Sequence, residues 1–173
     1  MRAIVTGGLT LEPQTAAHAD QMFVTLSDPA IYEYENKPPQ SLEWLRERFA
    51  KLESRRSADG KEQWLNWVIR LPTSELAGYV QATVRADGGA AIAYELSSAY
   101  WGRGLARQAV QALMTELAEQ YHVNRVTAVL KRGNQRSLRL LERLDFALAS
   151  TELQTKYEVE PGELLMWREI SST

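Results

Sequence analysis

One stretch, residues 94–113, constrains the fold more than any other part of the chain. It reads YELSSAYWGRGLARQAVQAL, in which a strand runs into a glycine-containing loop and then into an amphipathic helix. The first N–H groups of a helix lack partners inside it, and the helix dipole places partial positive charge there. Gly102 and Gly104 carry no Cβ, so an anion can approach the main chain closely. The stretch therefore predicts a diphosphate cradle.

The glycine spacing does not by itself identify a ligand. G-x-G turns also occur where a strand simply turns into a helix and binds nothing. The pattern is neither G-x-x-x-x-G-K-[ST] nor G-x-G-x-x-G, so neither the P-loop nor the dinucleotide-binding fingerprint fits. Arg103 and Arg107 add fixed positive charge beside the loop, which favours the anion site.

The composition narrows the function further. The 173 residues carry a formal net charge of −2, which provides no bulk attraction for nucleic acid. The absence of cysteine excludes disulfides and thiolate chemistry, and two isolated histidines argue against a metal centre. We find no apolar run long enough to span a membrane and no secretory signal pattern. We expect a cytoplasmic protein whose residues 1–173 form a single domain.

Hydrophobic periodicity predicts the order of the elements. An early strand at 9–12 and helices at 15–26 and 42–56 precede an antiparallel meander of strands at 63–71, 75–84 and 90–96. Gly78 inside the second meander strand indicates a bulge or a close backbone approach. A helix at 105–121 then crosses to a parallel strand at 125–130, and a helix from Asn134 and strands near 146 and 164–167 follow. This order is typical of a layered α+β domain.

Two motifs in this order resemble those of the GNAT N-acetyltransferase superfamily. The first, WGRGLA at 101–106, resembles the acyl-CoA pyrophosphate loop [QR]-x-x-G-x-[GA], with Trp101 in place of Gln or Arg. A Tyr-Trp-Gly-x-Gly version is common in the branch that contains the ribosomal-protein N-terminal acetyltransferases. The second, NQRSLRLLERLDF at 134–146, resembles N-x-x-S-x-x-L-L-E-x-L-G-F, with Asp145 in place of Gly.

The resemblance implies a GNAT-like layered α+β domain. Its mixed, mostly antiparallel sheet would have six to seven strands flanked by helices and would splay between its two central parallel strands. It implies acetyl-CoA as co-substrate and no metal. The pantetheine arm would pair with the backbone of 94–97, and the N–H of Leu96 would polarise the thioester carbonyl. The residues expected to contact the co-substrate are Tyr94, Leu96, Ser97, Trp101, Gly102, Arg103, Gly104, Leu105, Ala106, Arg107, Asn134 and Ser137.

Glu95 and Ser137 are the candidate catalytic residues. Glu95 adjoins the reacting segment, but strand alternation places it on the face opposite Tyr94 and Leu96. It therefore lies either in the acceptor cavity as general base or against the back of the sheet. Ser137 matches a family position near the sulfur or the CoA phosphates. It either protonates the leaving thiolate or caps or packs beside the helix start. Tyr157 is an alternative proton donor.

In the family, the first pair of helices and their loop wall the acceptor site. The resemblance therefore places the loop that follows the first helix near the incoming amine, with two of its carboxylates as alternative bases. Trp67 is interpreted either as a core residue or as a wall of the same pocket. The predicted acceptor-site residues are Tyr32, Glu33, Tyr34, Glu35 and Trp67.

The activity implied by the resemblance is N-acetyl transfer from acetyl-CoA to a primary amine by direct attack in a ternary complex. The acceptor would be a peptide N-terminus or a small-molecule amine, and the acidic loop favours a cationic one. One alternative is a non-catalytic acyl-CoA-binding sensor or regulatory module. Another is a protein that uses the cradle for a different diphosphate. A homodimer is common in the superfamily, and no membrane partner is expected.

Overall fold

The structure, a computed structural model, describes residues 1–34 and 36–172. Its strands form one sheet of eight, in the order β1-β2-β3-β4-β5-β6-β8-β7. The strands are β1 Ile4–Thr6, β2 Leu9–Pro13, β3 Gln63–Arg70, β4 Leu76–Val84, β5 Gly89–Leu96, β6 Arg125–Lys131, β7 Ala147–Leu148 and β8 Glu163–Glu169. All neighbouring strands are antiparallel except the pair β5 and β6.

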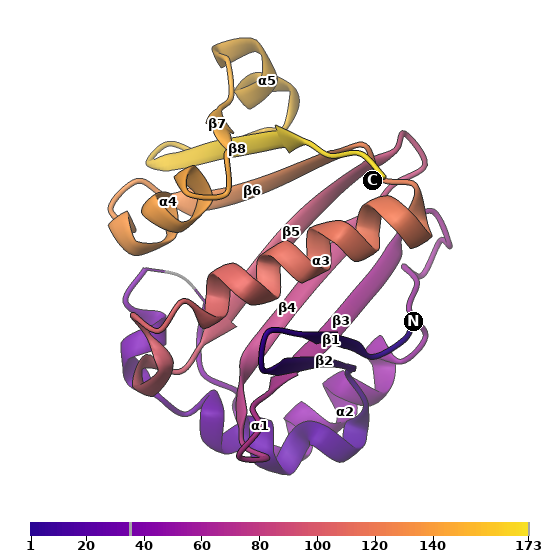
Figure 1. The fold of residues 1–173 in the computed structure, drawn as a ribbon, viewed down its shortest axis with the longest axis vertical. Helices are drawn as coiled ribbons and strands as arrows, with labels where there is room; N and C mark the ends of the chain where they lie inside the picture. The colour runs from indigo at the N-terminus through magenta and orange to yellow at the C-terminus, as the bar shows by residue number, and fades with distance from the viewer. Residues whose placement is uncertain (35, 173) are drawn as a thin grey trace.

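Helices cover both faces of the sheet. The α-helices are α1 Ala19–Thr25, α2 Leu42–Leu52, α3 Leu105–Tyr121, α4 Gln135–Glu142 and α5 Thr151–Lys156. Short 3₁₀ helices are η1 Ala16–His18, η2 Pro29–Tyr32 and η3 Ser98–Tyr100. Figure 1 shows α3 lying across the face of the central strands, with α4 beside β6. No helix in the described ranges has the length and apolar character needed to cross a bilayer.

Strand alternation divides the core between the two faces. Along β3, Trp67 and Ile69 pack into the larger core with α3 and α4. Val68 faces the other way and packs with Met22 of α1 and Phe49 of α2 in a smaller core. Because both faces of β3 are covered, the run from Trp67 to Ile69 is continuously apolar and does not reveal which residues face which helix.

The predicted α+β fold class is confirmed, with eight strands instead of six to seven. The additional strand β1 forms a hairpin with β2, through the glycine turn that precedes Leu9. The expected helix over 15–26 begins as η1 and continues as α1, and the expected helix over 42–56 ends at Leu52. The helix α5 was not predicted, because its six residues are too few for a periodic pattern to establish.

The two parallel strands separate along most of their length. They are paired only where 89–91 of β5 meet 125–127 of β6, and no further residue of either strand pairs with the other. Figure 1 shows β5 and β6 diverging from this point towards α4. This confirms the expected splay in the sheet and leaves a gap beside Ile92–Leu96.

Gly78 of β4 lies where two backbones approach closely, as the sequence predicts. A Cβ at this position would lie 1.9 Å from the carbonyl oxygen of Glu95. The register of β3 against β4 also shifts by one residue here, between Ile69 and Arg70, which marks a bulge. The close approach fixes the end of β5, from which Glu95 projects.

Candidate functional site

The loop before α3 adopts the open geometry that its glycines allow. Gly102 and Gly104 both have φ of +76°, and a Cβ at either position would meet no protein atom within 4 Å. Gly104 is the N-cap of α3, and no side chain caps this helix start. The N–H groups of Leu105, Ala106 and Arg107 therefore point out of the helix without helical partners. This is a site where an anion is stabilised by both the N–H groups and the helix dipole.

A cavity of about 500 Å³ opens at this helix start, and we call it the arginine cavity. It lies between the loop and α4. Its polar walls are four arginines, and its apolar walls include Leu105 and Leu140. Its lining residues are Leu96, Tyr100, Trp101, Gly102, Gly104, Leu105, Ala106, Arg107, Arg136, Arg139, Leu140 and Arg143.

Of the loop residues predicted to contact the co-substrate, Gly102, Gly104 and Arg107 line the arginine cavity. Arg103 does not line the cavity, because its guanidinium lies over the ring of Tyr100, 5.7 Å from the centroid. The sequence prediction did not include the other three arginines, Arg136 and Arg139 of α4 and Arg143 at its C-cap. Their spacing of i, i+3 and i+7 places them on one face of a helix and was a usable signal.

Two smaller cavities, of about 90 and 80 Å³, occupy the gap between β5 and β6, and we call them together the slot. The slot shares walls with the arginine cavity at Leu96, Trp101 and Arg136. Arg136 lies over the indole of Trp101, 3.2 Å from the ring centroid, and the indole N–H donates to the carbonyl of Leu96 at 2.9 Å. These contacts join the two cavities into one continuous surface.

The backbone of β5 presents its edge to the slot. The N–H of Ser97 donates to the carbonyl of Ala77 at 2.9 Å, so Ser97 belongs to the pairing with β4. Because backbone groups alternate along an antiparallel strand, the N–H and carbonyl of Leu96 point away from β4, towards the slot. The predicted role of Leu96 therefore agrees with the geometry, whereas the backbone N–H of Ser97 is already used.

Ser137 and Tyr94 meet across the slot. Their hydroxyl oxygens lie 2.7 Å apart. Tyr94 is therefore the tyrosine whose hydroxyl lies beside Ser137, where Tyr157 was considered as an alternative. Asn134 caps α4, and its Oδ1 accepts from the N–H of Ser137 at 3.1 Å. Tyr157 ends α5 and lines neither the slot nor the arginine cavity, so it does not occupy the predicted position.

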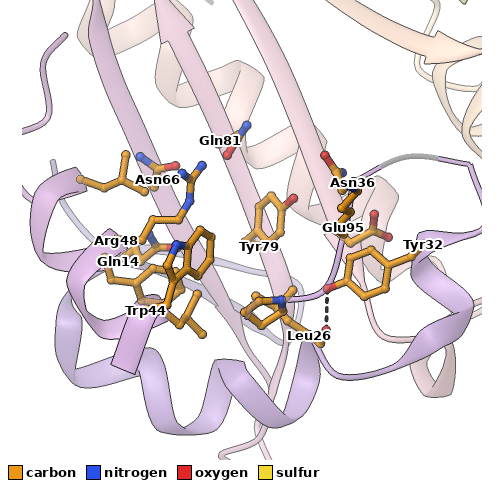
Figure 2. A pocket seen from close by; sticks show the side chains of 15 residues that line it. Gln14, Leu26, Tyr32, Asn36, Trp44, Arg48, Asn66, Tyr79, Gln81 and Glu95 are labelled. Atoms are coloured by element: carbon orange, nitrogen blue, oxygen red, sulfur yellow. Dashed lines mark hydrogen bonds between the residues drawn. The ribbon is translucent and has the colours of Figure 1, made fainter. Parts of the chain in front are cut away.

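A third cavity of about 300 Å³ lies on the opposite face of the sheet, under α2, and we call it the amide cavity. Its side-chain amides come from Gln14, Asn36, Asn66 and Gln81, and Gln14 and Asn66 are only 3% and 6% exposed. Asn66 and Gln81 are direct cross-strand partners. Figure 2 shows Trp44 and Arg48 on one side of this cavity, opposite Tyr32 and Glu95.

Glu95 lines both the amide cavity and the slot. Of the two placements that strand alternation allowed, the structure therefore shows the one in a cavity. Tyr79, directly opposite Glu95 in the sheet, is also shared by both. The side chain of Glu95 thus lies where the two faces of the sheet communicate.

Tyr32 closes the amide cavity beside Glu95. Its hydroxyl donates to the carbonyl of Leu26. Burial, with the nearby charges of Glu95 and Asp28, raises the pKa of Tyr32 to about 12. Tyr32 is therefore a neutral hydrogen-bonding wall at any physiological pH.

The other predicted acceptor-site residues do not all lie at one cavity. Tyr34 lines the slot, but Glu33 is exposed and lines none of the three cavities. Trp67 as a pocket wall is wrong. It is 0% exposed in the core on the α3 face, and its indole N–H donates to the carbonyl of Arg2 at 2.9 Å. Glu35 lies outside the described residues.

Asp28 connects the loop of η2 to the start of η3. Its carboxylate accepts from the N–H of Ser98 at 2.6 Å, from the hydroxyl of Ser97 at 3.2 Å and from the N–H of Ala30 at 3.0 Å. The hydrogen bonds from Ser98 are the main cause that lowers the pKa of Asp28.

Among residues 1–34 and 36–172, no cluster of three or more His, Asp or Glu side chains could hold a metal ion.

Comparisons with known proteins agree with this geometry. Residues 8–147 match the acetyltransferase (GNAT) domain family. The uncharacterized N-acetyltransferase p20 of Bacillus licheniformis is 27% identical over 167 residues, which cover 95% of this chain and 92% of that protein.

Solved structures share the fold. RimL, the ribosomal L7/L12 alpha-N-protein acetyltransferase in complex with coenzyme A, superposes with a TM-score of 0.81 at 22% identity over 99% of both chains. The ribosomal-protein-S5-alanine acetyltransferase of Vibrio fischeri gives a TM-score of 0.77 at 17% identity over 96% of both chains.

Proposed function

The chain belongs to the GNAT acetyltransferase family, and from this premise we propose that it transfers the acetyl group of acetyl-CoA to a primary amine. One observation carries the proposal. The splayed strands leave a slot that joins a cationic cavity on one face of the sheet to the amide cavity on the other, and Glu95 lines the junction. Donor and acceptor would meet there in a ternary complex.

The residues present fit an acyl-CoA. Gly102 and Gly104 leave open space for a diphosphate above the uncapped start of α3. The edge of β5 offers the main-chain N–H of Leu96 to an extended arm, in the manner of an added strand, while the carbonyl of Leu96 accepts from the indole of Trp101. The bound thioester supplies the activated acyl group, and the N–H of Leu96 would donate to its carbonyl oxygen as negative charge develops.

We assign the general base to Glu95. An attacking amine starts as ammonium at neutral pH, so a carboxylate must accept a proton directly or through water. Glu95 is the one carboxylate among the described residues that line both the amide cavity and the slot. Glu33, one of the alternatives, lines neither.

We assign the return of a proton to the departing sulfur to the hydrogen-bonded pair of Ser137 and Tyr94. The hydroxyl nearer the sulfur would donate its proton, and the 2.7 Å hydrogen bond would let the second hydroxyl replace it. Asn134 holds this end of α4 in place through its cap to Ser137. Ser137 is thus a proton donor beside the slot as well as a capped residue.

The charges of the amide cavity favour a peptide N-terminus over a polyamine. In the described part of the chain, its lining contains Lys37 and Arg48 but only one carboxylate, Glu95. Side-chain amides provide donors and acceptors that match peptide groups. A polycation would meet two like charges, so this balance points away from the cationic acceptor suggested by the acidic loop.

Two further points complete the proposal. We take residues 1–173 as one acetyltransferase domain, because a single sheet extends from β1 to β8. The alternative function, an acyl-CoA sensor without turnover, would use the same arginine cavity and slot but would not need a carboxylate at their junction with the amide cavity.

The test is release of free CoA thiol from acetyl-CoA with a panel of peptides, amino acids, polyamines and aminoglycosides. A mass increase of one acetyl group on the acceptor identifies the product. We expect turnover with a peptide N-terminus. Calorimetric binding of CoA without turnover on any acceptor would support the sensor, and binding of ATP or NAD in preference to CoA would contradict both.

A further inference from the structure

The arginine cavity holds more positive charge than a diphosphate requires. Arg107 of α3, Arg136 and Arg139 of α4 and Arg143, the C-cap of α4, line it. Within residues 1–34 and 36–172, no Asp or Glu lines this cavity or forms an ion pair with any of the four. Like charges repel, so this arrangement is unfavourable until an anion binds.

The three arginines of α4 and its C-cap are not equivalent. Arg136 lines the slot as well as the arginine cavity and is stacked on Trp101. Arg139 and Arg143 line only the arginine cavity. At a rise of 1.5 Å per residue, the stripe from Arg136 to Arg143 extends along α4 by about 10 Å. Arg139 and Arg143 therefore lie farther from the slot than Arg136 does, at the end of the arginine cavity away from the thioester.

The charge of CoA matches this surplus. A diphosphate diester carries two negative charges, and the start of α3 together with Arg107 and Arg136 can neutralise them. CoA carries an additional phosphomonoester on its ribose, and such a group has a charge of about −1.5 to −2 at neutral pH. Arg139 and Arg143 remain to meet it, and guanidinium groups bind phosphate through two parallel hydrogen bonds.

We propose that Arg139 and Arg143 form a binding site for the ribose phosphomonoester of CoA, so that the protein distinguishes CoA from dephospho-CoA. The inference rests on the proposed function, because it requires an acyl-CoA in the cavity. It goes beyond that function, since a bound diphosphate and a thioester in the slot do not themselves require the two arginines.

The experiment is calorimetric titration with CoA and with dephospho-CoA. We expect the unaltered protein to bind CoA roughly 10- to 100-fold more tightly, as one or two charge-assisted contacts would give. The double variant Arg139→Ala/Arg143→Ala should lose this preference while its affinity for dephospho-CoA stays the same. Arg132→Ala is the matched control, because Arg132 is exposed just before α4 and lines none of the three cavities. It should keep the full preference.

Each other outcome overturns the inference. Equal binding of the two compounds by the unaltered protein would leave acetyl transfer intact and remove the phosphate site. A preference that survives in the double variant would place the phosphate elsewhere. If neither compound binds, the proposed function fails as well. Circular dichroism checks folding, and the single variants Arg139→Gln and Arg143→Gln provide the same comparison if the double variant does not fold.

Discussion

The arginine cavity and the amide cavity lie on either side of one slot but are assembled in opposite ways. The arginine cavity comes from two short segments, 96–107 and 136–143, and main-chain groups make its centre. The amide cavity collects side chains from separate parts of the chain, among them Gln14, Asn66, Gln81 and Glu95. The first is local in sequence, and the second exists only when the whole sheet is in register.

This difference predicts different responses to substitution. A main-chain anion site tolerates changes in most of its side chains but not the addition of a Cβ where the anion must approach. A site made of side chains depends on each one separately. Substitutions in the arginine cavity should therefore change CoA affinity, whereas those at the junction with the amide cavity should change turnover.

The largest expected effect is at the junction. Glu95→Gln removes the proposed base but keeps the shape of the side chain, so kcat should fall by about 10²- to 10⁴-fold. Calorimetric affinity for CoA should not change. Glu33→Gln is the control, because Glu33 is exposed outside the three cavities. Full activity of Glu95→Gln would mean that the base lies elsewhere.

Gly104→Val tests whether the main chain at the start of α3 binds the diphosphate of CoA. The new side chain enters the space above α3, and the left-handed φ of +76° adds strain. Affinity for CoA should fall about tenfold or more, as the loss of one charge-assisted contact would give. Gly60→Val is a matched control. Gly60 has φ of +72° and equally open surroundings in a turn before β3, so it carries the strain without the ligand site. Equal CoA affinity in both variants would refute the cradle.

Tyr94→Phe and Ser137→Ala sharpen the comparison inside the slot. Each should lower kcat by roughly tenfold, and the double variant should lose little more, because the two hydroxyls act as one proton path. Steady-state kinetics of the four proteins measures the coupling. Tyr157→Phe, at the end of α5, should behave as the unaltered protein. Additive losses would show that the two hydroxyls act separately.

The smallest effect is expected at Asp28, whose carboxylate accepts hydrogen bonds from Ala30 of η2 and from Ser97 and Ser98 at the start of η3. Asp28→Asn should raise KM for both substrates by a few-fold, through misplacement of 97–98. Hydrogen bonds from Ser98 lower the pKa of Asp28 in the folded state. Its contribution to stability is therefore present above the unfolded pKa of about 3.9 and is lost as pH falls through the lower folded pKa.

Thermal unfolding between pH 3 and pH 7 checks this sign. The Tm difference between the unaltered protein and Asp28→Asn should be constant at neutral pH and close only in acid. Asp59→Asn is the control, because hydrogen bonds also lower the pKa of Asp59 in a surface turn that lines no cavity. Its KM values should stay unchanged. A Tm difference that grows in acid would contradict the assignment.

The arginine cavity was predictable from the sequence in part. The loop at 101–107 is contiguous, so its glycines, its helix start and most of its wall follow from one short pattern. The splay also followed, through the family resemblance. Arg139 and Arg143 were recoverable from helical spacing, but which face of α4 meets the cavity depends on how the helix packs.

The amide cavity was not predictable in the same way. Asn66 and Gln81 meet because β3 and β4 pair in one register, and that register contains a bulge. Trp67 illustrates the difficulty. Both faces of β3 are covered, so an apolar residue there is consistent with either face, and the structure places it in the larger core. Long-range pairing decides such cases, and no short motif encodes it.

The separation of β5 from β6 affects how the protein avoids intermolecular association and how it would respond to selection for stability. An open strand edge at the rim of a sheet invites intermolecular association, and proteins usually blunt it. Here the unpaired edge at Ile92–Leu96 lies inside the sheet, between strands and helices of the same molecule. A single extended chain can therefore enter beside it, but the edge strand of another sheet cannot. Directed evolution for heat resistance alone would favour substitutions that pair β5 with β6 along their whole length. The resulting variants would be more stable, but they would have no slot and no activity.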